Sequence, residues 1–328
     1  MNFVFAVIVS AIVFIITYFL TPPFIRYLQS NGMTVKDYHK PNNKHVPRPG
    51  GPIIMISLAT AEVNLFLLTM NNGVLTILIC TLIAFFIGYI DDKKIMPGYF
   101  KPLALVVAAI PIILLGTYDF NLDFPLFNSA RIPLLYIGLI VLIIPVVGNT
   151  INSIDVLNGV VSGFIAIASV PLIVALIMNN KFEIAIAALP LFFSAITFYK
   201  YHRYPSRIFP GDSGTLAWGA MYAAIAIVGG VEFVAIVALL PAIINSFLFL
   251  ASVKRIAEHR TIQVRPVILL DDYKLMASME KAAPITLVRM ILAAGPLHEN
   301  EVTRNIFKLA AFSAGMAILT AFLIRVVI

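Results

Sequence analysis

The sequence contains little charge for its length. Only 12% of its 328 residues are Asp, Glu, Lys or Arg, whereas 60% are hydrophobic. A soluble domain of this size cannot bury so much apolar surface, and typical domains carry about twice this share of charge. A lipid bilayer solvates such a surface, so the composition indicates an integral membrane protein.

Cysteine is almost absent as well. The single Cys80 lies inside an apolar run, which excludes a disulfide framework and a cluster of metal-binding thiolates. The sequence also lacks a P-loop, a Gly-x-Gly-x-x-Gly fingerprint, a nucleophile elbow and a His-Glu-x-x-His motif. If the chain is an enzyme, we expect it to use carboxylates and amides with a metal ion rather than a protein nucleophile.

Ten apolar runs approach the length of a membrane-spanning helix, which is about 20 residues. Their approximate bounds are 2–20, 52–70, 73–90, 102–117, 131–148, 159–178, 182–198, 214–229, 231–252 and 307–327. We therefore predict an all-α integral membrane protein with about ten transmembrane helices in a single domain, 1–328. The first run follows no basic residue and precedes no small-residue cleavage site, so we interpret it as a retained helix.

Lys and Arg are distributed unequally between the connections on the two sides of the predicted membrane helices. Of the 23 Lys and Arg residues, all but Arg131, Lys181 and Arg325 lie in or beside five alternate connections. These connections are 21–51, 91–101, 149–158, 199–213 and 253–306. By the positive-inside rule they face the cytoplasm, and both termini face outside. The same rule and anionic lipid headgroups account for the net charge of +7, so we expect no nucleic acid partner.

The last of these connections is the longest. Residues 253–306 are too many for a simple turn and too mixed in composition for a disordered tract. We predict short structured elements there, a hairpin and an amphipathic helix on the membrane surface.

Two adjacent carboxylates, Asp91 and Asp92, end the third run, and Lys101 begins the fourth. A solvated helix end next to Lys93 and Lys94 is the simplest interpretation. Carboxylates at headgroup depth are nevertheless costly without a cationic partner. Together with Lys101 they suit a site for a phosphate and a divalent metal.

Polar residues recur every three positions at Asn149, Asn152, Asp155 and Asn158. In a helix this spacing places them along one slowly turning face. Hydrogen bonding between transmembrane helices would explain one or two of them. Four at one cytoplasmic end favour a polar binding site.

The segment 204–214 is rich in Pro and Gly and precedes an apolar run. Such residues restrict the backbone and hold side chains in place. Asp212 suits either a cap of the next helix or an oxygen ligand for Mg²⁺. Phe209 suits either stacking on a planar base or anchoring in lipid.

Two further features have simple alternatives. Glu258-His259-Arg260 is compatible with an ordinary cytoplasmic basic cluster, but Arg and His together also suit a diphosphate. Glu62 lies in the middle of the second run, where a carboxyl is either functional or a contact between helices.

The ordered motifs resemble those of the polyprenyl-phosphate N-acetylhexosamine-1-phosphate transferases, of the glycosyltransferase 4 type. They are Asp91-Asp92…Lys101, Asn149-x-x-Asn152…Asn158-Gly159, Tyr204-Pro205-Ser206-Arg207-x-Phe209-x-Gly211-Asp212, His259-Arg260 and Gly295-Pro296-Leu297-His298-Glu299. The resemblance covers nearly the whole chain. It is closest to the eukaryotic and archaeal branch that transfers GlcNAc-1-phosphate to dolichyl phosphate, and more distant from the phospho-MurNAc-pentapeptide transferases.

The resemblance implies a reaction. The phosphate of a membrane-bound polyprenol or dolichol attacks the sugar-linked phosphorus of a UDP-sugar, here UDP-GlcNAc, and UMP leaves. This is the first lipid-linked step of glycan assembly, and it would take place on the cytoplasmic face, at the cell membrane in a prokaryote. The resemblance also admits a homodimer.

The resemblance also implies roles for individual residues. Asn152 and Asp212 would bind Mg²⁺, and Asp91 and Asp92 would align or deprotonate the lipid phosphate. The other implied contacts are Lys101 with phosphate oxygens, Asn158 and Phe209 with uracil, His259 and Arg260 with the diphosphate and sugar, and Asn149 with substrate.

The chain departs from the eukaryotic pattern at two places. Glu258 stands where an Arg-His-Arg triplet would begin, and a tryptophan expected near Gly98 is missing. Both departures concern the donor's end of the site, so the sugar is less constrained than the reaction. The alternative for a ten-helix chain is a transporter, which predicts polar groups near the bilayer midplane.

Overall fold

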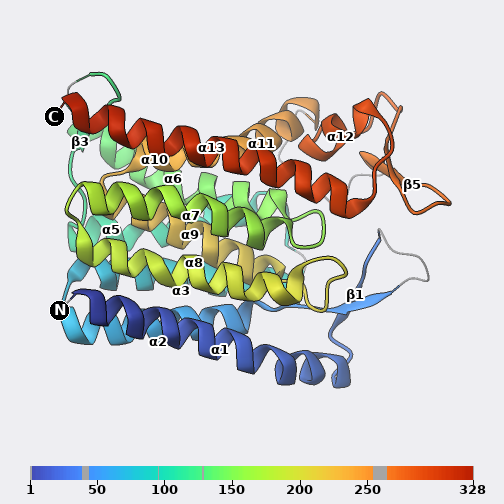
Figure 1. The fold of residues 1–328 in the computed structure, drawn as a ribbon, viewed down its shortest axis with the longest axis horizontal. Helices are drawn as coiled ribbons and strands as arrows, with labels where there is room; N and C mark the ends of the chain where they lie inside the picture. Colours follow the sequence, from blue (N-terminus) through green and yellow to red (C-terminus); the bar gives the residue numbers. More distant parts are fainter. Residues whose placement is uncertain (1, 39–43, 95, 128, 254–263, 328) are drawn as a thin grey trace.

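The computed structural model describes residues 2–38, 44–94, 96–127, 129–253 and 264–327, and most of them form helices that run side by side in one bundle (Figure 1). The long helices are α1 (Asn2–Ser30), α2 (Gly51–Thr69), α3 (Asn72–Lys93), α6 (Pro133–Ile154), α7 (Val160–Met178), α8 (Phe182–His202), α9 (Gly211–Gly229), α11 (Leu240–Val253) and α13 (Glu299–Val327). The shorter ones are α4 (Phe100–Leu105), η2 (Val107–Ala109), α5 (Ile110–Leu115), α10 (Glu232–Ala238), α12 (Leu287–Ile291) and η4 (Leu292–Ala294).

The strands are short and form three antiparallel pairs. These pairs are β1 (Thr34–Lys36) with β2 (His45–Pro47), β3 (Asn121–Leu122) with β4 (Ala130–Arg131), and β5 (Val267–Leu269) with β6 (Leu275–Ala277). The β5–β6 pair and α12 occupy the described part of the long connection 253–306.

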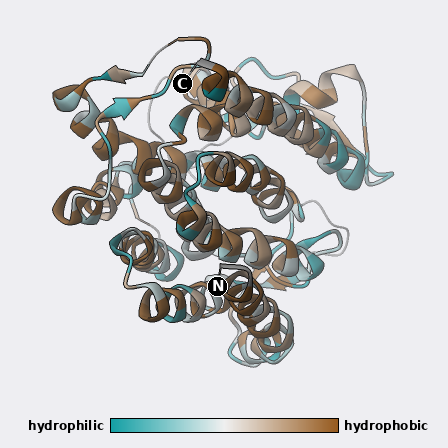
Figure 2. Cartoon of the chain, turned by 60° about the vertical axis from the view of Figure 1, so that its left-hand side comes forward, coloured by the Kyte–Doolittle hydropathy of each residue, from teal (hydrophilic) through white to brown (hydrophobic). Residues whose placement is uncertain are grey.

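The helices have the length and composition of membrane spans. Within the described residues, seven are long and apolar enough to cross a bilayer, and the bent pair α10–α11 would make eight. The seven are α1, α2, α3, α6, α7, α8 and α13. Figure 2 shows hydrophobic residues along the helices and hydrophilic ones mainly in the connections. A mostly helical protein with several helices capable of spanning a membrane is thus confirmed, while the count of ten spans and the sidedness of the loops stay predictions.

Two of the predicted runs are interrupted, and a proline follows each break. The run 102–117 is divided into α4, η2 and α5, and the run 231–252 is bent by 69° between α10 and α11. Pro111 and Pro241 lie just after these breaks. Because proline has no backbone N–H, neither residue can donate to the carbonyl four positions earlier.

Both termini lie at one end of the bundle, and β1 and β5 lie at the opposite end (Figure 1). We call the latter the hairpin end. α1 reaches Ser30 rather than ending near residue 20, and α13 begins at Glu299 rather than near 307. The first and last helices therefore extend beyond their apolar runs at the hairpin end.

Helix α9 forms the centre of the bundle. Nearly all its residues are buried, and many are Gly or Ala, which lets neighbouring backbones come close. At Gly219 an added Cβ would lie 2.7 Å from the Cα of Gly148 on α6. The two backbones therefore leave no space for a side chain at this crossing.

We expect Gly219→Ala to destabilise the protein by about 1–3 kcal/mol, because backbone atoms rather than a movable side chain oppose the new methyl group. Thermal unfolding in detergent measures this effect. Gly138→Ala on α6 is the matched control, since a Cβ there meets nothing within 4 Å. Equal melting temperatures for the two variants would contradict the packing of α6 against α9.

Candidate active site

A cavity of about 720 Å³ opens at the hairpin end of the bundle. We call it the site cavity. Its lining comes from β1 and the turn after it, from the segment before α2, from the ends of α3 and α6, from the connection after α6, from α4, and from the loop before α9 and the start of α9. The lining residues are Val35, Lys36, Asp37, Tyr38, Arg48, Pro49, Asp92, Lys101, Asn152, Ser153, Asp155, Val156, Leu157, Asn158, Phe209, Gly211 and Asp212.

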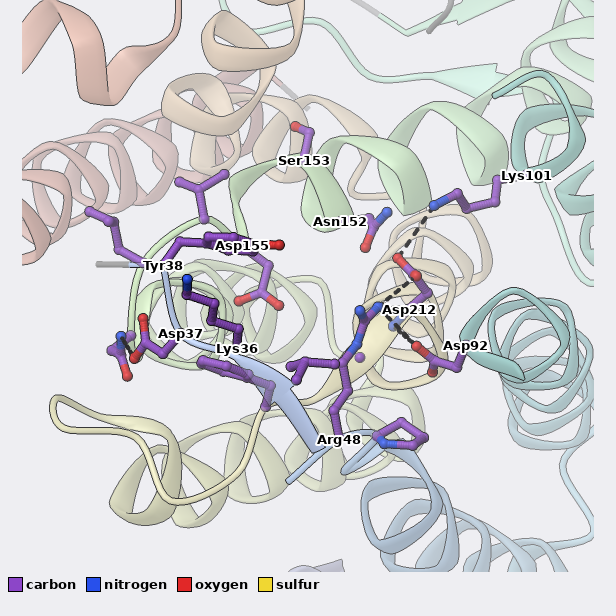
Figure 3. A pocket seen from close by; sticks show the side chains of 17 residues that line it. Lys36, Asp37, Tyr38, Arg48, Asp92, Lys101, Asn152, Ser153, Asp155 and Asp212 are labelled. Atoms are coloured by element: carbon purple, nitrogen blue, oxygen red, sulfur yellow. Dashed lines mark hydrogen bonds and ion pairs between the residues drawn. The ribbon is translucent and has the colours of Figure 1, made fainter. Parts of the chain in front are cut away.

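Arg48 and Lys101 both contact Asp212 at one wall of this cavity, and Arg48 also contacts Asp92 (Figure 3). Asp91, beside this wall, is a third carboxylate and pairs with Lys101. Arg48 Nη2 lies 2.8 Å from Asp212 Oδ2 and 3.0 Å from Asp92 Oδ1. Lys101 Nζ lies 3.1 Å from Asp91 Oδ2 and 3.4 Å from Asp212 Oδ1. Asp212 is the member that both cations share.

Asp92 binds the N-terminus of α9. The backbone N–H groups of Asp212 and Ser213 each donate to its carboxylate at 2.9 Å, and the Ser213 hydroxyl donates at 2.6 Å. First-turn N–H groups of a helix have no partner within the helix and favour a negative charge. The cap of α9 is therefore supplied by α3, and the Asp212 carboxylate, which also suited a cap, is turned toward the cations instead.

Glycine makes this arrangement sterically possible. Gly211 has φ +73°, and an added Cβ would lie 2.8 Å from both carboxylate oxygens of Asp92. On α3, a Cβ at Gly88 would lie 2.6 Å from the Cα of Ser213. Side chains at either position would separate α3 from the first turn of α9.

The loop before α9 is held by the segment before α2. Phe209 N–H donates to Pro47 O at 3.0 Å, and Phe209 O accepts from Gly50 N–H at 2.8 Å. Gly51 N–H donates to Pro210 O at 2.8 Å. This short backbone ladder places Arg48 and Phe209 on the same wall of the site cavity.

The predicted asparagines have different surroundings. Asn152 lines the cavity, and its Oδ1 accepts from the Thr215 hydroxyl at 2.7 Å. Asn149 donates to Pro145 O within α6 at 2.8 Å and is not among the lining residues. Helix α6 ends at Ile154, so the regular helical face expected from 149 to 158 covers only its first half.

Asn158 is buried between three segments of the chain. Its Nδ2 donates to Asp37 Oδ2 at 3.1 Å and to Glu299 Oε1, and its Oδ1 accepts from Ser206 N–H at 2.8 Å. The amide therefore joins the turn after β1, the start of α13 and the loop before α9. Its implied contact with uracil stays a prediction.

Four other predicted residues differ in how the structure places them. Phe209 lines the cavity, and its ring meets the His202 ring edge-on at 6.0 Å between centroids. His259 and Arg260 lie outside the described residues. Glu62 is buried in α2 with no hydrogen-bond partner for either carboxylate oxygen among the described residues, and its role stays open.

No motif in the sequence predicted a role for Arg48. It is nevertheless the cation that joins Asp92 to Asp212. Burial by itself would lower the pKa of Arg48, but Asp212 and Asp92 outweigh it and raise the pKa. The only signal was its place before Pro49-Gly50-Gly51 in a basic connection.

Asp155 also lacked an assigned role, although it shares the three-residue spacing of the asparagines. Its side chain is 17% exposed, and Oδ1 lies 3.7 Å from His202 Nε2. Burial raises the pKa of Asp155 to about 7, with Arg48 lowering it and Asp212 and Asp92 raising it. Asp155 therefore changes charge near neutral pH.

The cavity offers oxygen ligands of the type that Mg²⁺ prefers. Asn152 supplies an amide oxygen and Asp212 a carboxylate, and both line the same cavity. Among the described residues, no group of three His, Cys, Asp or Glu side chains is arranged to hold a metal alone. Mg²⁺ commonly binds one or two carboxylates and completes its shell with water and substrate phosphates, so this set fits that ion.

We expect Asp155→Asn to raise the free energy of unfolding at pH 8 by about 2 kcal/mol more than it does at pH 5. In the unfolded chain the carboxyl ionises near pH 4, whereas in the folded protein it ionises near pH 7. The wild type therefore loses stability as pH rises through this window, and the amide does not. Melting temperatures at both pH values test this. Asp271→Asn, at an exposed position, should show no such pH difference, and a pH-independent effect of Asp155→Asn would be the contrary result.

The chain is similar to known proteins over most of its length. Residues 74–230 match the sequence profile of Glycosyl transferase family 4. The phospho-N-acetylmuramoyl-pentapeptide-transferase of Limosilactobacillus fermentum is 31% identical over 242 residues, which are 66% of this chain and 72% of the relative.

Archaeal relatives match as well. A putative UDP-N-acetylglucosamine–dolichyl-phosphate N-acetylglucosaminephosphotransferase of Saccharolobus solfataricus is 25% identical over 66% of this chain and 69% of the relative. A putative glycosyltransferase of Methanocaldococcus jannaschii is 27% identical over 86% of each chain. The ordered motifs, the family profile and these relatives agree, and the chain therefore belongs to glycosyl transferase family 4, the polyprenyl-phosphate N-acetylhexosamine-1-phosphate transferases.

Proposed function

We propose that the protein transfers GlcNAc-1-phosphate from UDP-GlcNAc to a polyprenyl or dolichyl phosphate and releases UMP. The observation that carries this proposal is the cluster of Arg48, Lys101 and three carboxylates in a cavity at one end of an apolar bundle. A lipid-borne phosphate and a water-borne nucleotide sugar can meet only at such an interface. The relatives include a putative N-acetylglucosaminephosphotransferase and a phospho-N-acetylmuramoyl-pentapeptide-transferase, so either GlcNAc or MurNAc-pentapeptide is compatible with the family as the transferred group.

In this reaction an oxygen of the lipid phosphate forms a bond to the sugar-linked phosphorus. The bond from that phosphorus to the oxygen of UMP breaks, and UMP leaves with the electron pair. The attacking group is already an anion, so catalysis consists mainly of holding the two phosphates in line and offsetting their charge.

The side chains of the site cavity suit these tasks. Arg48 and Lys101 are shared among carboxylates, so an arriving phosphate competes with those carboxylates for the same N–H donors. The oxygens of Asn152 and Asp212 would hold a Mg²⁺ ion, whose charge would offset that of the diphosphate. Phe209 presents a ring for the uracil.

The two acidic residues of α3, Asp91 and Asp92, would have different roles in this reaction. Both oxygens of Asp92 accept hydrogen bonds from the start of α9, which supports a positioning role for this residue. Asp91 accepts from Met96 N–H at 3.0 Å and pairs with Lys101. We assign Asp91 the alignment of the lipid phosphate through Lys101.

We also propose how the chain crosses the membrane. The interrupted segment Phe100–Leu115 and the central helix α9 would add two spans to the eight that length and composition support. With ten spans, the hairpin end faces the cytoplasm and both termini face outside. The transporter alternative predicts a polar site at the midplane, whereas the site cavity lies at the ends of α3 and α6 and the start of α9.

Purified protein should release UMP from UDP-GlcNAc only when a polyprenyl phosphate and Mg²⁺ are present, and a chelator should stop the release. UMP release from a panel that includes UDP-MurNAc-pentapeptide identifies the donor. Release from the pentapeptide donor alone would overturn the GlcNAc assignment but keep the reaction. Flux of a UDP-sugar into proteoliposomes without UMP formation would overturn the reaction itself.

Asp212→Asn should lower UMP release by about a hundredfold or more, because it removes a carboxylate that contacts both Arg48 and Lys101 and faces the cavity. The substitution keeps the side chain's shape, so folding can be checked by the melting temperature. Asp271→Asn, an exposed position far along the chain, serves as the control and should keep full activity. Wild-type activity in Asp212→Asn would remove this residue from the mechanism.

A further inference from the structure

A second cavity, of about 390 Å³, lies beside the C-terminal part of α1. We call it the rear cavity. Its lining residues are Pro22, Ile25, Arg26, Gln29, Lys44, His45, Pro47, Ser206 and Arg207. Arg26, Lys44 and Arg207 contribute three positive charges from three separate segments, and no carboxylate is among the lining residues.

These cations have no acidic partner within the part of the chain that the structure describes. Among the described residues, no carboxylate forms an ion pair with Arg26, Lys44 or Arg207. Arg207 only lies over the Tyr201 ring, at 5.7 Å from its centroid. Three cations around the rear cavity repel each other, so a bound anion with several acceptor oxygens would stabilise this arrangement. A phosphate group provides such oxygens.

The position along α1 points to a lipid rather than a free ion. Arg26 is the first charged residue of the chain and follows the apolar run 2–20. Because about 20 residues cross the hydrocarbon layer, residues from about 22 onward lie at headgroup depth. The rear cavity therefore opens where the phosphates of the membrane lie.

An apolar stripe continues from the cavity toward the membrane interior. Ile8, Ile15 and Phe19 are 40%, 52% and 63% exposed, and their spacing places them on the face of α1 that carries Pro22 and Arg26. α1 is also the least buried of the seven candidate spans. A lipid with its phosphate in the rear cavity would lay an acyl chain on this stripe.

We infer that the rear cavity binds the phosphate headgroup of an anionic membrane lipid, with Arg26, Lys44 and Arg207 as its ligands. The cavity lies behind the active-site wall, because His45 and Pro47 line it while the next residue, Arg48, lines the site cavity. In the same way Arg207 faces the rear cavity and Phe209 the site cavity. A bound lipid would hold both segments of the backbone ladder in place.

The test is lipid binding by the purified, delipidated full chain, measured by native mass spectrometry. Phosphatidylglycerol should bind more tightly than phosphatidylcholine with the same acyl chains. The double variant Arg26→Gln/Lys44→Gln should bind phosphatidylglycerol about thirtyfold more weakly, which is about fivefold for each lost charge. Arg304→Gln/Lys308→Gln removes two exposed cations near the start of α13 and should bind as the wild type does.

Three outcomes would overturn the inference. One is equal phosphatidylglycerol binding by the wild type and both double variants. Another is complete displacement of the lipid by millimolar inorganic phosphate, which would make the cavity a site for a free anion. The third is displacement by stoichiometric polyprenyl phosphate, which would make it a site for the acceptor. If the double variant loses stability without lipid, Arg207→Gln tests the same cavity from another segment, and Arg26→Lys/Lys44→Arg should restore binding.

Discussion

The structure of the site depends on one buried carboxylate, that of Asp92. It receives two backbone N–H groups and a hydroxyl from the first turn of α9, and Arg48 pairs with it from outside that helix. A negative charge at a helix N-terminus satisfies donors that the helix itself cannot use. Since α9 is the central helix of the bundle, this contact determines where the bundle presents Asp212.

Close backbone packing makes the contact possible. Gly88 on α3 and Gly211 at the start of α9 have no space for a side chain, and the Asp92 carboxylate reaches the α9 N–H groups only because both are glycine. Further along α9, Gly219 meets Gly148 on α6 in the same manner. The geometry of the polar site therefore depends on the same close packing of glycines that holds the membrane helices together.

The charges of the site are balanced only in part. Arg48 and Lys101 face Asp91, Asp92 and Asp212, and Asp155 adds a fourth carboxyl whose pKa of about 7 reflects burial near the others. An excess of negative charge attracts a divalent cation, and two shared cations remain attractive to phosphate oxygens. This combination suits the proposed reaction, in which both substrates are phosphates. Arg26, Lys44 and Arg207 form a different arrangement, with three cations and no acid, which suits an anion alone.

The sequence by itself determined the apolar, membrane-type composition, the helical class and several of the segments that line the site cavity. The thickness of the bilayer sets the length of an apolar run, and its lack of water favours helices, so both can be predicted without knowing how the helices pack. The motifs identified six residues that the structure brings to one cavity or beside it. They are Asp91, Asp92, Lys101, Asn152, Phe209 and Asp212.

Only the tertiary structure decided which partner each side chain has. It showed that Asp92 rather than Asp212 caps α9, that Arg48 joins the two carboxylates, and that Asn158 connects Asp37, Ser206 and Glu299. It also showed where prolines break the fourth and ninth runs. The partners of Asp92, Arg48 and Asn158 lie between 44 and 164 positions away in the sequence. A local pattern of residue types contains no information about which distant segment packs beside it.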